Sequence, residues 1–111
     1  MKQSCLIKDI IATYRKHGWQ LQRVLMRSAT RSEVIDKEQT TLEGAEVDQS
    51  EVDALWFSRP SQGQREAWEL RLVAESPYAL FETFAADESE ELREQARQEM
   101  EGRLREYVAR A

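Results

Sequence analysis

Residues 65–74, REAWELRLVA, decide the fold of this 111-residue chain, because their apolar side chains recur at every second position. One side of an extended chain would carry Trp68, Leu70, Leu72 and Ala74, and the other would carry Ala67, Glu69, Arg71 and Val73. A period of two is the spacing of a β-strand, whose successive side chains point to opposite faces. The stretch therefore predicts a strand over residues 65–74.

Two neighbouring segments predict strands that pair with it. Residues 53–59 alternate Leu55 and Phe57 with Ala54, Trp56 and Ser58, and residues 78–84 are rich in aromatic side chains. The turn-forming residues PSQG at 60–63 and ESP at 75–77 separate the three segments. Because the connections are short, we expect an antiparallel meander.

The two ends of the chain predict amphipathic helices. Residues 4–17 repeat their apolar side chains at intervals of three and four, and Gly18 follows as a residue that can end a helix in the left-handed conformation. Asp87 and Glu90 have the spacing of a reciprocal helix cap. From there a second stripe runs to the end of the chain, through Leu92, Ala96, Met100, Leu104, Tyr107, Val108 and Ala111.

The segment between the first helix and the meander is less regular. Residues 19–27 predict a strand if a β-bulge near Gln22 and Arg23 brings Trp19, Leu21, Val24 and Met26 to one side. Residues 28–50 are polar, although Ser32 could cap a short helix. More than twenty residues of coil would be unusual in a compact domain, so we expect some structure there.

This order of elements predicts a single α+β domain over residues 1–111. We expect a two-layer sandwich in which the N-terminal helix and the long C-terminal helix pack on an antiparallel sheet of about four strands, a first strand followed by the meander. The expected core consists of Leu6, Ile10, Trp68, Leu70, Leu72, Leu92, Met100 and Leu104.

Composition points to a cytoplasmic protein. Cys5 is the only cysteine, so the chain has no internal disulfide. Lys8 and Asp9 interrupt the apolar residues near the N-terminus, which excludes a signal peptide or membrane span there. The net charge is −5, with eight basic and four acidic residues in 1–40 against eight basic and seventeen acidic in 41–111. An acidic total opposes nonspecific binding to nucleic acid.

Several chemistries are excluded by the residues available. Cys5 and His17 are the only thiol and imidazole, and on one helix they would lie about 18 Å apart. Two such ligands are too few for a structural zinc site. The acidic run over 43–53 lacks the calcium-loop spacing, and the four glycines are too scattered for a nucleotide-binding loop. We therefore expect no catalytic residue, metal or cofactor.

Surplus apolar residues suggest an interaction surface. If both helices cover one face of the sheet, the other face exposes a set of large side chains, and patches of this kind mark subunit or ligand contacts. The set is Trp56, Ala67, Val73 and Phe81. The leading hypothesis is therefore a noncatalytic binding or interaction protein that forms a homodimer or recruits another protein. The alternative is that residues 28–50 fold across this face.

Two other functions remain open. Arg65, Glu69 and Arg71, beside Trp56, could form the polar pocket of a small enzyme or ligand-binding protein. A basic cluster with aromatic neighbours could instead hold the phosphates and bases of a nucleic acid. This cluster comprises Arg15, Lys16, Arg23, Arg27 and Arg31, and the acidic total makes that function the less favoured one.

Overall fold

The computed structural model describes residues 3–35, 42 and 44–110, and over these residues it contains three α-helices and a five-stranded mixed sheet. The α+β class predicted from the sequence is therefore confirmed. In chain order the elements are α1 (Gln3–Lys16), β1 (Gln20–Met26), α2 (Ser28–Ile35), β2 (Glu46–Gln49), β3 (Ala54–Pro60), a short 3-10 turn (Gln62–Gln64), β4 (Glu66–Leu72), β5 (Ala79–Phe84) and α3 (Glu90–Arg110).

The sheet has the strand order β2-β1-β3-β4-β5. The predicted meander of β3, β4 and β5 is present and antiparallel, and β1 joins it antiparallel to β3. β2 is an addition, because it pairs parallel to β1, with Val24 opposite Val47. The expected four-stranded antiparallel sheet is thus too small by one parallel edge strand. Parallel pairing is possible because α2 provides the crossover between β1 and β2.

The irregular middle segment contains more structure than its polar sequence indicates. α2 begins at Ser28, four residues before the predicted cap Ser32, and it directs Val34 into the core. Residues 36–41 and 43 of the segment lie outside the described residues. The predicted bulge in β1 is confirmed, since the register with β3 shifts between Leu21 and Arg23.

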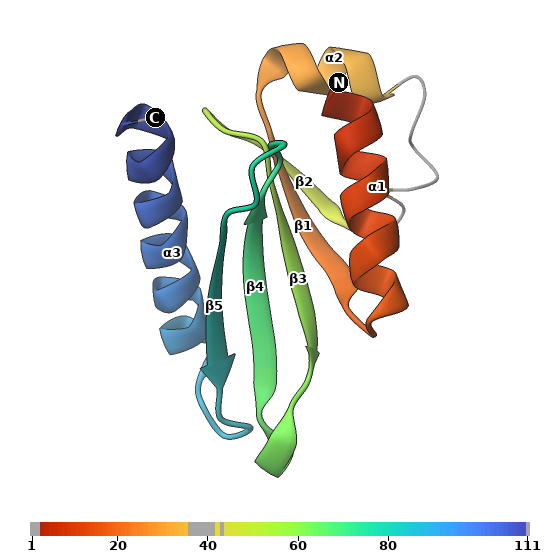
Figure 1. The fold of residues 1–111 in the computed structure, drawn as a ribbon. Coiled ribbons are helices and arrows are strands. Elements are labelled where there is room, and N and C mark those ends of the chain that lie inside the picture. Colours follow the sequence, from red (N-terminus) through yellow and green to blue (C-terminus); the bar gives the residue numbers. More distant parts are fainter. Residues whose placement is uncertain (1–2, 36–41, 43, 111) are drawn as a thin grey trace.

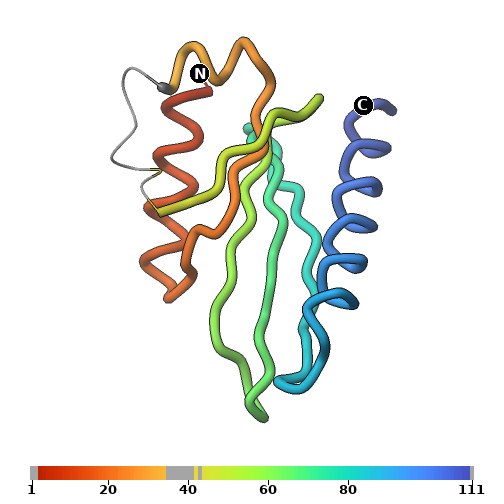
Figure 2. The backbone as a smooth tube through the Cα atoms, turned by 180° about the vertical axis from the view of Figure 1, so that it is seen from behind, coloured from red at the N-terminus to blue at the C-terminus, as the bar shows by residue number. Residues whose placement is uncertain are grey.

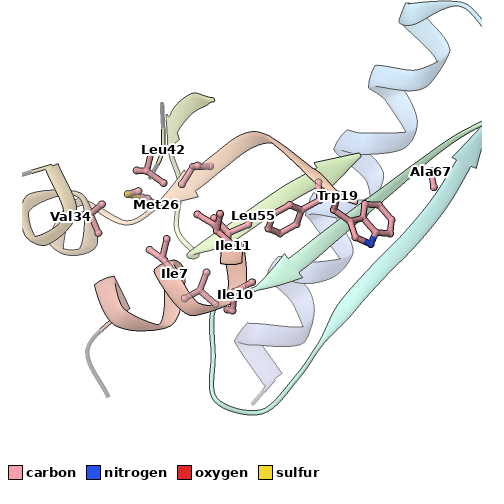
Figure 3. Close-up of a cluster of buried hydrophobic side chains, with 12 residues drawn as sticks. Ile7, Ile10, Ile11, Trp19, Met26, Val34, Leu42, Leu55 and Ala67 are labelled. Carbon is pink, nitrogen blue, oxygen red and sulfur yellow. The ribbon is translucent and has the colours of Figure 1, made fainter. Parts of the chain in front are cut away.

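One core cluster lies between the sheet and the helix pair α1 and α2. Ile7, Ile10 and Ile11 of α1 pack with Leu55 of β3 (Figure 3). Phe57 of β3 belongs to the same cluster. The bulge brings the predicted side chains of β1 to this side, where Trp19, Val24 and Met26 are buried and Leu21 packs against them. Gly18 has a φ of +86°, which provides the predicted left-handed end of α1.

A second core cluster lies on the opposite face of the sheet, under α3. Met100 and Leu104 of α3 pack with Trp56 of β3 and with Trp68 and Leu70 of β4. The two terminal helices therefore lie on opposite sides of the strands (Figures 1 and 2). The expected two-layer sandwich is wrong in this respect, because β3 directs large apolar side chains to both of its faces and each face needs its own helix.

Charged side chains contribute to the packing of α3. Arg97 is only 1% exposed, and its guanidinium lies 4.5 Å from the ring centre of Trp68. The same guanidinium donates hydrogen bonds to the carboxylates of Glu94, at 2.9 Å, and Glu90. The indole N–H of Trp56 donates to the buried carboxylate of Glu101 at 2.8 Å. The contact of Arg97 with the Trp68 ring and the hydrogen bond from Trp56 to Glu101 therefore join α3 to the sheet.

The start and exposed face of α3 differ from the prediction. The helix begins at Glu90, and its cap is Ser89, whose hydroxyl accepts from the backbone N–H of Leu92 at 3.2 Å. Leu92 was expected in the core but is 54% exposed. Of the other expected core residues, Ile10, Trp68, Leu70, Met100 and Leu104 are buried, and Leu6 and Leu72 are half-buried.

Truncating two leucines of α3 tests this orientation. We expect Leu104→Ala to lower the free energy of unfolding by about 2–5 kcal/mol, because the side chain is fully buried and its loss leaves a cavity. Leu92→Ala should change it by less than about 0.5 kcal/mol. Urea denaturation followed by circular dichroism measures both values, and similar losses in the two variants would contradict the orientation of α3.

Candidate functional site

The two terminal helices cover different strands as well as different faces, so part of the sheet stays uncovered. α1 packs over β1 and β3 on one face, and α3 packs over β4 and β5 on the other. Among the described residues, no helix covers the α1 side of β5, and α1 reaches only part of that side of β4, where Ala67 is buried and Tyr14 contacts Glu69. We call this region the open half-face. The strand register places on it Glu69, Arg71, Ala79, Phe81 and Thr83.

Phe81 is the main apolar group of the open half-face. It is 58% exposed, the largest exposure of any large hydrophobic side chain in the described part of the chain. Its ring meets the buried Trp19 edge to face, with the ring centres 6.5 Å apart. The guanidinium of Arg59 lies 4.5 Å from the centre of the Trp19 ring and donates to the backbone carbonyl of His17 at 2.9 Å. An aromatic contact with a fixed cation therefore borders the open half-face.

The polar groups of the open half-face are bonded within the chain. The hydroxyl of Tyr14, whose ring stacks on Phe57 at 4.1 Å, donates to the carboxylate of Glu69. Burial, followed by this hydrogen bond, raises the pKa of Tyr14 well above its usual range, although the nearby Arg71 acts in the opposite direction. Tyr14 is therefore a neutral donor at physiological pH and cannot serve there as a general base.

A cavity of about 320 Å³ lies at the end of α1 beside the open half-face. It is lined by Thr13, Tyr14, His17, Trp19, Arg59 and Glu69. The sequence predicted Tyr14 and Trp19 only as aromatic neighbours of the basic cluster and did not select Arg59, which comes from β3. The available signal was that two aromatic residues and an arginine, Tyr14, Trp19 and Arg59, stand close to the ends of predicted elements.

The predicted interaction set does not form one surface. Trp56 is fully buried under α3, on the other side of the sheet from Phe81. Ala67 and Val73 do point to the α1 side, but both are buried there. Of the four residues, only Phe81 is exposed.

The predicted polar pocket is also divided among separate contacts. Arg65, Glu69 and Arg71 share one side of the β4 segment, as expected, whereas Trp56 lies on the other side. Arg65 donates to the hydroxyl and carbonyl of Thr83, and Arg71 donates to the carbonyl of Leu72. Only Glu69 reaches the cavity at the end of α1.

The predicted basic cluster is distributed over the molecule. Arg15 and Lys16 end α1, and Arg31 is exposed on α2. Arg23 pairs with Glu94 at 2.8 Å, and Arg27 pairs with the buried Asp53 at 3.1 Å. The carboxylate of Asp53 also accepts from Thr30 at 2.6 Å and from Gln3 at 2.8 Å. Two of the five cations are therefore neutralised locally and do not contribute to one basic patch.

The residue types considered for other chemistry stay dispersed. Cys5 and His17 lie near opposite ends of α1, and both are exposed. In residues 3–35, 42 and 44–110, no three His, Cys, Asp or Glu side chains gather in a way that could hold a metal ion. No described helix combines the length and the apolar character that crossing a membrane requires.

Comparisons with known proteins returned no match, whether against protein-family models, curated proteins or solved structures.

The ion pair between Arg23 and Glu94 predicts a pH dependence of stability. The hydrogen bond from Arg23 lowers the pKa of Glu94 to about 2, against an ordinary value of 4.5. A carboxylate with a lowered folded-state pKa contributes stability that is complete above about pH 5 and lost as the pH falls toward 2. We expect Glu94→Gln to reduce the slope of unfolding free energy against pH in this window.

Arg23→Gln should reduce the slope as well, and the double variant should add little to either single change. Urea denaturation between pH 2 and 6 measures the slopes. Unchanged slopes in both single variants would show that this pair does not set the acid sensitivity.

Proposed function

We propose that this chain is a noncatalytic, cytoplasmic protein-interaction domain that forms a homodimer through the open half-face. The observation that carries the proposal is the exposure of Phe81, an aromatic residue on an edge strand with no helix above it among the described residues. Exposed aromatic side chains are typical anchors of protein interfaces, because they bury much apolar area with few rotatable bonds.

The arrangement of polar groups supports binding over catalysis. Glu69, Arg71 and Arg65 each bond to a neutral group of the same chain, so their side chains are held in place. A general base needs an accessible acceptor, and the raised pKa of Tyr14 removes the nearest phenol from that role. Such fixed polar groups suit the rim of an interface.

The distribution of charge supports a protein partner over a nucleic acid. Binding to a phosphate backbone requires several unpaired cations on one surface. Arg23 and Arg27 are paired with carboxylates, and the whole chain carries a net charge of −5. The paired cations and the acidic net charge therefore support a protein partner over a nucleic acid.

A small ligand is the second candidate occupant, on the evidence of the cavity at the end of α1. Glu69 and Arg59 line it together with the Trp19 ring, so it offers an anion, a cation and an aromatic surface within about 320 Å³. A small zwitterion would match these groups. A ligand of this kind should raise the melting temperature in a thermal-shift screen, because it binds only the folded state.

Charge at position 81 should abolish the dimer. We expect light scattering at micromolar concentration to give about twice the 13.0 kDa mass of one chain, and Phe81→Glu to give the mass of one chain. The new carboxylate would have to lose its water of hydration in the interface. Leu92→Glu is the matched control, since it changes a similarly exposed apolar residue on α3 and should leave the dimer intact.

A single-chain mass for the unmodified protein would contradict the dimer. Equal loss of the dimer in both variants would show that position 81 is not special.

A further inference from the structure

The free edge of the sheet at β5 has a defined pattern of backbone groups. The N–H of Leu72 donates to the carbonyl of Tyr78 at 2.9 Å, so the backbone of Tyr78 faces β4. In an antiparallel strand the N–H and C=O of one residue point the same way and alternate from residue to residue. Leu80 and Glu82 therefore also face β4, and Ala79, Phe81 and Thr83 present their backbone groups to the outside.

Side chains of the same molecule block one end of this edge. The N–H of Thr83 donates to the carboxylate of Glu82 at 3.1 Å, and its carbonyl accepts from Arg65 at 3.1 Å. Pro77 closes the other end, because proline has no N–H. Between these limits, the backbone groups of Ala79 and Phe81 carry no such cap within the described part of the chain. The other edge strand, β2, is four residues long and bears Glu46 and Asp48.

We propose that β5 pairs antiparallel with β5 of a second copy of this chain, about a two-fold axis at Leu80. This inference rests on the proposed function and assigns the homodimer contact to the β5 edge and to one strand register. The axis sets Ala79 opposite Phe81 of the second copy, so the outward groups of both residues are used in each chain. A two-fold axis at Phe81 would instead require the capped Thr83, and an axis at Ala79 would require Pro77.

The side chains are compatible with this register. On the α1 side, the large Phe81 lies across from the small Ala79 of the second copy. On the α3 side, Leu80 meets its own counterpart in a non-hydrogen-bonded pair, where the Cα atoms are about 4.5 Å apart. Pairing in this way makes one continuous sheet through both molecules and keeps the exposed Phe81 at the junction.

Charge complementarity on the α3 side supports a second copy as the occupant. A groove of about 380 Å³ lies beside β5, lined by Tyr78, Arg103, Glu106, Tyr107 and Arg110. Tyr78 stacks on Tyr107, with ring centres 3.7 Å apart, and so fixes the groove next to the strand. In the proposed register, Glu82 of the second copy lies opposite Tyr78. Its Oε1 accepts from its own Thr83, and its second carboxylate oxygen is brought to a groove that holds two cations, Arg103 and Arg110, against the one anion Glu106.

Amide hydrogen exchange of the unmodified protein tests the pairing without a substitution. The N–H groups of Ala79 and Phe81 should be protected by roughly tenfold or more at high protein concentration, and they should lose this protection on dilution to the monomer. The N–H of Leu80 bonds to β4 within the chain, so its protection should change much less. Nuclear magnetic resonance resolves the three residues separately.

Disulfide trapping tests the register. In a Cys5→Ser background, which removes the exposed native thiol, Leu80→Cys should form a covalent dimer on mild oxidation, because the two Cα atoms lie within disulfide reach. Glu82→Cys is the control: its two copies would be about 14 Å apart along the strands. Position 82 is the more exposed of the two, so random collision would form disulfides at position 82 more readily than at position 80. Light scattering under reducing conditions verifies that both variants are dimers.

The outcomes separate this inference from the proposed function. Protection at Ala79 and Phe81 together with selective trapping at position 80 supports the pairing. A dimer that dissociates with Phe81→Glu but shows neither effect would overturn the strand pairing and leave the open half-face as the contact surface. A monomer at every concentration would overturn both proposals.

Discussion

The central strand β3 must be covered on both of its faces, and the arrangement of the other elements follows from this requirement. Leu55 and Phe57 point to one side of the sheet and Ala54 and Trp56 to the other, and all four are fully buried. Leaving either pair in water would forfeit several kcal/mol of hydrophobic stabilisation, at about 1.5–3 kcal/mol for each large side chain. The molecule has a long terminal helix for each side, so α1 takes one face and α3 the other.

Two helices on opposite faces of a five-stranded sheet cannot cover all of it. α1 with α2 lies over the β1 half, where aliphatic side chains pack with Phe57 and Trp19, and α3 lies over the β4 half, where tryptophans meet arginine and glutamate. Among the described residues, the uncovered surface that carries a large exposed apolar side chain of the sheet is the α1 side of β5. The open half-face differs from a general apolar patch because it combines one exposed aromatic ring with polar groups that are already bonded.

Local periodicity predicted the strands of this fold well and its layers poorly. The two-residue alternation identified β3, β4 and β5, and the break of this alternation in β1 located the bulge between Leu21 and Arg23. Alternation shows which side chains of one strand share a face, but it does not fix the register between strands, so Trp56 was grouped with Phe81 although it lies on the face of Trp68 and Leu70. β2 was missed because Val47 is its only large apolar residue. Phe81 was among the predicted surface residues because Phe81 and Phe84 stand an odd number of residues apart in one strand, so one of the two had to face away from the other.

The separation of the two core clusters has a consequence for synthesis on the ribosome. All the side chains of the α1 cluster have been translated by Val73, whereas the α3 cluster waits for Leu104. At the usual elongation rate of about 5–20 residues per second, the intervening chain takes roughly 2–6 s. Trp56, Trp68 and Leu70 therefore leave the ribosome before the helix that shields them. This order of synthesis requires that a chaperone or rapid docking of α3 protects these side chains from aggregation.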